Sequence, residues 1–106
     1  MTSTIIETPE LIAWSARVWS VAECLEFIDW ISENSLAGDV ILGAGPLRKV
    51  HWTRQGMGKS GGARVIYFNR LVSGEVVLLQ VYIKAKFDNL RPESLLQLKE
   101  RFDDPT

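Results

Sequence analysis

The spacing of apolar residues changes its period about halfway along the chain. After a short β-branched stretch at residues 3–7, apolar residues recur at helical spacing through the first third of the sequence. From residue 49 onward, apolar and polar residues alternate or form short apolar runs, as strands do. The pattern predicts the order β-α-α-β-β-β-α. We therefore expect an α+β fold, in which a small antiparallel β-sheet packs with an N-terminal helical hairpin and a C-terminal helix.

Capping signals place the predicted helices. Thr8 precedes Pro9, which suits an N-cap followed by the first helical position. The stretch Ser20–Glu23 has the spacing of a capping box, so a second helix is expected to begin there. A third helix is predicted over residues 92–102, with an apolar face made by Leu95, Leu98 and Phe102.

The predicted strands lie between segments rich in glycine. Ser73-Gly74 reads as the turn of an antiparallel hairpin. Residues 38–46 are expected to form a loop, and residues 54–61 a flexible connection. The strands themselves are predicted at residues 49–53, 63–69 and 75–83.

Length and composition fit one globular domain spanning residues 1–106, with 46% apolar residues. No apolar run approaches the ~20 residues of a membrane span, and the N-terminus does not resemble a signal peptide. With Cys24 as the single cysteine and His51 as the single histidine, neither a disulfide framework nor a zinc site is expected. We expect a cytoplasmic protein that uses no metal and no cofactor and has no membrane partner.

The formal net charge of −1 conceals a strong asymmetry along the chain. Residues 1–46 carry a net charge of −6, residues 47–91 carry +7, and residues 92–106 carry −2. A basic central segment between acidic flanks is suited to a polyanionic partner.

Strand alternation gathers several of the bases on one surface. If Val50 and Trp52 enter the core, Lys49 and His51 face solvent together. A plainer interpretation is open for each residue: strand bases are often only solvated, and a histidine or tyrosine is often structural. Trp14, Trp30, Trp52 and Cys24 are expected in the core. The residues expected to converge are Lys49, His51, Arg64, Tyr82, Lys84 and Lys86.

Two apparent nucleotide-binding motifs fail. Gly58-Lys59-Ser60 resembles the end of a P-loop, but Thr53 stands where that motif requires a glycine. Around Gly43-Ala44-Gly45, Arg48 occupies the position of the third glycine of a dinucleotide fingerprint. We therefore exclude nucleotide-cofactor functions.

Several segments resemble the RelE/HigB-like toxins of bacterial type II toxin–antitoxin systems. The most specific is Gly58-Lys59-Ser60-Gly61-Gly62-Ala63-Arg64-Val65-Ile66-Tyr67. Further resemblance lies in Ile5–Pro9, in Gly38–Ile41, in Gly45 with Leu47-Arg48-Lys49, and in the fourth strand ending in Tyr82 and Lys84.

This resemblance implies a ribosome-dependent endoribonuclease, an mRNA interferase that cuts mRNA in the ribosomal A site and so inhibits translation. It implies a cognate antitoxin as partner, together with ribosome and mRNA, and contact with operator DNA only through the antitoxin complex.

Metal-independent cleavage would use the neighbouring 2′-OH as nucleophile, with side chains supplying base, acid and positive charge. We assign Arg64 to the scissile phosphate, and Lys49, Lys84 and His51 to proton transfer or charge stabilisation. The remaining candidates are assigned to RNA binding, namely Lys59, Lys86, Arg48 and Tyr82, the last by stacking or hydrogen bonding.

His51 stands where the family usually has a second base, which leaves an alternative open. The chain could be a catalytically degenerate module that binds RNA or the ribosome, or a toxin subunit acting mainly in an operon-repressing antitoxin complex. No helix-turn-helix signal favours direct reading of DNA by this chain.

Overall fold

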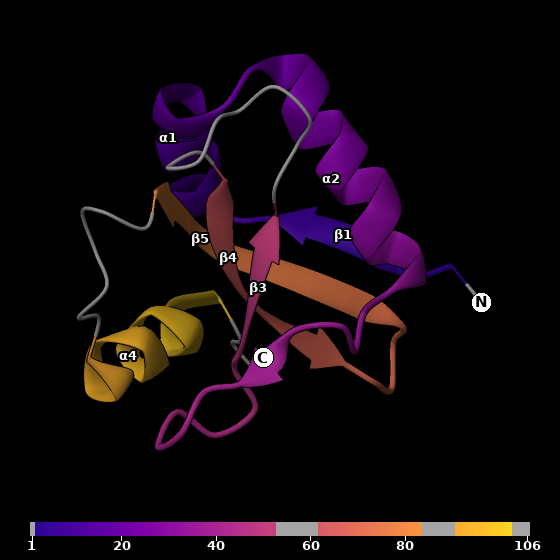
Figure 1. Cartoon of the computed structure of the whole chain (residues 1–106). Coiled ribbons are helices and arrows are strands. Elements are labelled where there is room, and N and C mark those ends of the chain that lie inside the picture. Colours follow the sequence, from indigo (N-terminus) through magenta and orange to yellow (C-terminus); the bar gives the residue numbers. More distant parts are fainter. Residues whose placement is uncertain (1, 53–61, 84–90, 103–106) are drawn as a thin grey trace.

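A computed structural model describes residues 2–52, 62–83 and 91–102. The described elements are β1 (Thr4–Glu7), α1 (Pro9–Val18), α2 (Val21–Glu33), β2 (Asp39–Val40), β3 (Arg48–Trp52), β4 (Ala63–Arg70), β5 (Glu75–Ile83) and α4 (Pro92–Phe102). The strands form one sheet in the order β1-β5-β4-β3-β2. Helices α1 and α2 cover one face of the sheet, and α4 lies against the other (Figure 1). The predicted α+β class is confirmed.

Both N-terminal helices begin where the sequence predicts. The Thr8 hydroxyl accepts a hydrogen bond from the backbone N–H of Leu11 and donates one to the Leu78 carbonyl oxygen at 2.8 Å. It therefore caps α1 and ties its start to β5. Ser20 and Glu23 form the predicted capping box, each side chain accepting from the other residue's backbone N–H.

The core on the α1–α2 face is rich in aromatic rings. Phe27 is fully buried, and its ring meets that of Trp52 edge to face with centroids 5.5 Å apart. Trp30 packs on Trp52 at 5.1 Å, and Trp19 on Phe27 at 5.5 Å. The expectation that Trp14, Trp30, Trp52 and Cys24 belong to the core is confirmed. Aromatic pairs of this kind add about 0.5–1.5 kcal/mol each beyond their buried area.

The second core lies between the sheet and α4. Leu95 and Leu98, the two described members of the predicted apolar face, are buried against the sheet. Two bases lie over the Phe68 ring in this core: Lys99 Nζ is 4.9 Å from its centroid and the Arg70 guanidinium is 5.7 Å away. The sheet contributes Ile66, Phe68, Val77, Leu79 and Tyr82.

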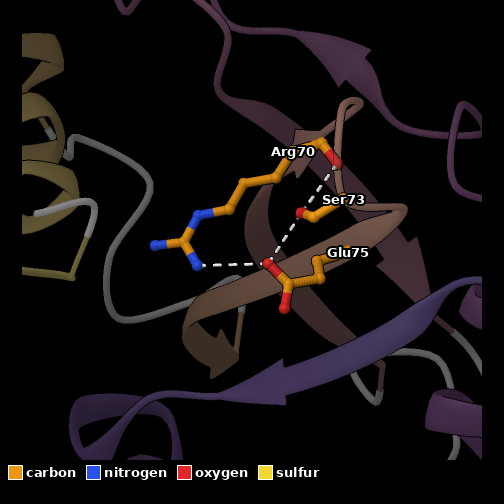
Figure 2. A network of polar contacts seen from close by, with 3 residues as sticks. All are labelled: Arg70, Ser73 and Glu75. Carbon is orange, nitrogen blue, oxygen red and sulfur yellow. Dashed lines mark hydrogen bonds and ion pairs between the residues drawn. The ribbon is translucent and has the colours of Figure 1, made fainter. Parts of the chain in front are cut away.

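The hairpin between β4 and β5 closes through a small polar network (Figure 2). The Ser73 hydroxyl donates to Glu75 Oε1 at 2.8 Å, and Arg70 Nη1 contacts the same oxygen at 3.3 Å. These two contacts, the serine first, lower the pKa of the Glu75 carboxyl. Gly74 has a φ of 69°, a conformation that favours glycine, as the predicted turn requires.

Two details of the sheet differ from prediction. β1 pairs parallel with β5, so the sheet is mixed rather than wholly antiparallel. In the sequence, the two helices α1 and α2 separate β1 from all the other strands. The residues of a strand do not reveal which neighbour it will pair with. Asp39–Val40 forms a short strand, β2, inside the predicted loop 38–46, where its backbone pairs with Lys49 and Arg48.

Candidate functional site

The candidate site is built on the ends of three adjacent strands, β3, β4 and β5. Their register places His51 directly opposite Arg64, and Arg64 directly opposite Tyr82. Directly opposed residues of antiparallel strands project to the same face, with Cβ atoms about 4.5–5.5 Å apart. We call these three residues the Arg64 row.

A second row lies next to it and contains Lys49. Lys49 opposes Ile66, which opposes Gln80. Ile66 packs in the core under α4, so both rows project to the α4 side of the sheet. Neither row contains an acidic residue. The prediction that Val50 and Trp52 turn inward while Lys49 and His51 are exposed is confirmed.

The pairing of β4 with β5 shifts by one residue between Ile66 and Tyr67, at the boundary between these two rows and the apolar core under α4. Across it, Ile66 opposes Gln80 and Tyr67 opposes Leu78, which leaves Leu79 as an extra residue in β5. Leu79 packs under α4 while Gln80 opposes Ile66 of the same core. Because of the bulge, the successive residues Leu79 and Gln80 both lie on the α4 side of β5. Leu79 ends the apolar part of that side, and Gln80 begins the part that belongs to the two rows.

Arg64 is the most informative member of the site. Its side chain is half-buried, and its Nη1 atom is fully shielded from solvent, yet Nη1 makes no hydrogen bond to any residue that the structure describes. A buried charged nitrogen without an acceptor costs more than the ~1–3 kcal/mol of a neutral group. The guanidinium thus keeps a donor for which the described residues supply no acceptor, and its planar fork has the shape that matches two oxygens of a phosphate.

The burial of Tyr82 bears on one of the two roles considered from sequence. Its side chain is only 2% exposed and packs in the α4 core. Its ring therefore offers no open surface for stacking on a base. Tyr82 lies opposite Arg64 on the neighbouring strand, and its hydrogen bonding to RNA stays a prediction.

Arg48 is not brought to the site. It shares the α1–α2 face with its partner Tyr67, opposite to the face of Lys49 and His51. Arg48 Nη1 donates to the carbonyl oxygens of Gly38 at 2.6 Å and Leu36 at 3.3 Å. These bonds hold the segment between α2 and β2 in place, and the RNA contact expected of Arg48 stays a prediction.

Tyr67 holds the same segment from β4. Its hydroxyl accepts from the Gly38 backbone N–H and donates to the Ser35 carbonyl oxygen, both at 2.9 Å. Burial is the main cause that raises the pKa of this phenol. A Cβ at Gly38 would lie 2.8 Å from the Tyr67 ring, so only glycine fits here. The segment thus supports the edge of the sheet beside β3.

Three nominated lysines, Lys59, Lys84 and Lys86, lie outside the described residues, and their roles stay predictions. Within the described part of the chain, no group of three or more histidine, cysteine or acidic residues is arranged to hold a metal ion. No helix in those same segments is both long and apolar enough to span a membrane.

Sequence reasoning missed the pairing of His51 with Arg64. Alternation within one strand gives the face of a residue but not its cross-strand neighbour, which depends on register. The sequence holds a signal only for the neighbouring pair: counting back from the Ser73-Gly74 turn along strands 63–69 and 75–83 places Arg64 near Tyr82.

No family model matches the sequence. Among solved structures, the fold is similar to that of a double arginine-to-alanine mutant of the E. coli toxin RelE in the free state. The TM-score is 0.65 at 13% sequence identity, and the match covers 93% of this chain and 98% of the other. The fold implied by the sequence resemblance is therefore confirmed.

Proposed function

We propose that this protein is a toxin of a toxin–antitoxin pair, and that it acts as a ribosome-dependent endoribonuclease on mRNA. The RelE-like fold and the sequence resemblance support the class of protein. The single observation that carries the activity is the buried Nη1 of Arg64, which bonds to no described residue and is set in a row with His51 and beside Lys49, in two rows whose described residues include no acid.

The proposed chemistry follows from what RNA cleavage requires. The 2′-oxygen attacks the adjacent phosphorus, a base takes its proton, the bond to the 5′-oxygen breaks, and an acid protonates that leaving oxygen. Arg64 binds the phosphate oxygens and stabilises the charge that develops on them, an effect worth about 10²–10³-fold for one well-placed donor. Lys49 and His51 are separated by one residue of β3, project to the same face and are the described candidates for proton transfer.

Lys84, Lys59 and Lys86 complete the proposal from the sequence alone. Lys84 is a further candidate for proton transfer, and the other two are proposed to bind flanking phosphates. The partners proposed are a cognate antitoxin, the ribosome with its mRNA, and operator DNA only through the antitoxin complex. A cytoplasmic location is part of the same proposal.

The test is induced expression of the full chain in bacteria, followed by growth measurement and primer extension on a translated mRNA. The wild type should arrest growth and produce cuts only in translated regions. Arg64→Ala should relieve both effects. Arg17→Ala is the matched control, because Arg17 is an exposed arginine on α1 that lies over Trp14 on the opposite side of the sheet.

Growth arrest with no new 5′ ends would instead favour the degenerate module that binds the ribosome without cutting. If the Arg64→Ala variant cuts as the wild type does, Arg64 has no part in the reaction.

A further inference from the structure

An apolar groove lies between α1 and α2, on the face of the sheet opposite to the Arg64 row. It encloses about 310 Å³ over the end of β1. Its walls include Ile12 on α1 and Val21 and Leu25 on α2, which are 55%, 78% and 59% exposed. Three large aliphatic side chains around one hollow form an apolar patch of the kind that marks a binding surface.

The floor of the groove contains hydrogen-bond donors without acceptors. Trp19 is 8% exposed, and its indole Nε1 is buried with no hydrogen bond to any described residue. The Ser15 hydroxyl is also buried on the groove wall and makes no hydrogen bond to any described residue. Both groups face the Cys24 thiol, whose pKa they lower, but sulfur is a weak acceptor, so a stronger acceptor entering the groove would improve their pairing. A carbonyl oxygen entering it would satisfy Trp19.

Cys24 lies beside these donors at the groove floor. Its sulfur is 3.9 Å from Oε2 of Glu7, to which the thiol donates. Burial raises the pKa of the thiol and the Glu7 carboxylate raises it further, so the neutral thiol adds to the apolar character of the floor.

The charge around the groove is negative. Glu7 lines it, and Asp29 follows Leu25 by one helical turn on the exposed side of α2. The only base in residues 1–46 is Arg17, which lies over the Trp14 ring and lines a different hollow. This field repels nucleic acid and attracts a basic partner.

We propose that the α1–α2 groove is the docking site for a segment of a partner protein that presents apolar side chains, Lys or Arg on its flank, and a carbonyl oxygen to Trp19. The apolar walls take the aliphatic anchors, and Glu7 and Asp29 select the basic flank. The site is separate from the cleavage site and does not depend on RNA cleavage, because the sheet lies between the two.

The test is selection from a displayed library of random 16-residue peptides against the full wild-type chain. The selected peptides should be apolar with a net positive charge. Leu25→Lys changes an exposed side chain and adds a repelling charge, so it should weaken their binding at least tenfold. Trp19→Phe keeps the ring and removes the N–H, and should weaken binding about fivefold. Val72→Lys, at a fully exposed apolar position of the β4–β5 turn, is the matched control and should leave binding unchanged.

Recovery of no specific peptide would overturn the proposal, and so would acidic peptides or binding that Leu25→Lys leaves intact. A concentration-dependent dimer of the wild type that Leu25→Lys abolishes would also overturn it, because a second copy would then be the occupant. Cleavage activity serves as an independent readout: Leu25→Lys should cut RNA like the wild type. Loss of peptide binding with cleavage retained, or the reverse, separates this proposal from the proposed enzymatic function.

Discussion

The two faces of the sheet differ in the groups that they present. Under α1 and α2, aromatic rings cover the sheet. The exposed outer side of these two helices is apolar and acidic, and the groove between them contains buried neutral donors. On the α4 side, the core covers part of the sheet, and beyond it lie the bases Lys49, His51 and Arg64. One face is suited to a basic peptide and the other to a polyanion. A chain with a net charge of −1 can thus present two opposite electrostatic surfaces.

Removing the aromatic centre of the α1–α2 face should cause the largest change. Phe27→Ala should lower the free energy of unfolding by about 3–5 kcal/mol, since Phe27 is fully buried and contacts three tryptophan rings. Urea unfolding followed by circular dichroism measures the difference. Ala13→Ser, at an exposed position of α1, should stay within about 0.5 kcal/mol of the wild type. A Phe27→Ala variant as stable as that control would show that this face is not the stabilising one.

The next largest effect concerns Lys49 on the opposite face. If Lys49 transfers a proton, Lys49→Ala should slow cleavage about 10²-fold or more while leaving the urea midpoint unchanged, because the side chain is exposed. Lys49→Arg keeps the charge but has a pKa too high for proton transfer, so it should restore RNA binding without restoring the rate. Full activity in Lys49→Arg would reduce Lys49 to a phosphate contact.

Much of the fold was predictable because local signals agreed with it. The Thr8-Pro9 and Ser20–Glu23 caps, the alternation about Val50 and the Ser73-Gly74 turn each depend on residues close in sequence. The parallel partner of β1 and the strand Asp39–Val40 were not predictable, because each depends on backbone pairing with distant residues.

The same distinction applies to the site. The exposed face of Lys49 and His51 followed from alternation, whereas the hydrogen bonds that Arg48 makes on the opposite face did not. A basic residue at the start of a strand gave no sign that the Gly38 carbonyl would be its partner. The groove also escaped prediction. Cys24 was interpreted as a core residue, which it is, and its place in the sequence gives no sign of the open groove beside it.

A smaller effect is expected where Tyr67 supports the edge of the sheet. Tyr67→Phe removes the bonds to Gly38 and Ser35 and should cost about 1–2 kcal/mol. Hydrogen exchange at the Gly38 amide should accelerate with it, while exchange at the Thr8 amide, bonded to Leu78 on the far side of the sheet, should keep its rate relative to global unfolding. Unchanged protection at Gly38 would contradict this role.

The smallest effect is expected at the hairpin turn. Because Ser73 and Arg70 lower the pKa of Glu75 below its usual 4.5, folding favours the ionised carboxylate. Its contribution to stability is present at neutral pH and is lost as the pH falls below 4.5 through the folded-state value. Glu75→Gln should therefore be slightly less stable than the wild type at pH 7, and the difference should vanish in acid and shrink in 1 M salt. A difference that grows in acid would contradict the network in Figure 2.

The central claim is that RNA is cut on the α4 side of the sheet around Arg64. The most direct measurement is the single-turnover rate of mRNA cleavage by purified protein on programmed ribosomes, compared among the wild type, Arg64→Ala and Leu25→Lys. We predict that Arg64→Ala is slower by about 10²–10³-fold and that Leu25→Lys is unchanged within about twofold. An Arg64→Ala variant that cuts at the wild-type rate, or a Leu25→Lys variant that does not cut at all, would contradict the assignment of the two faces.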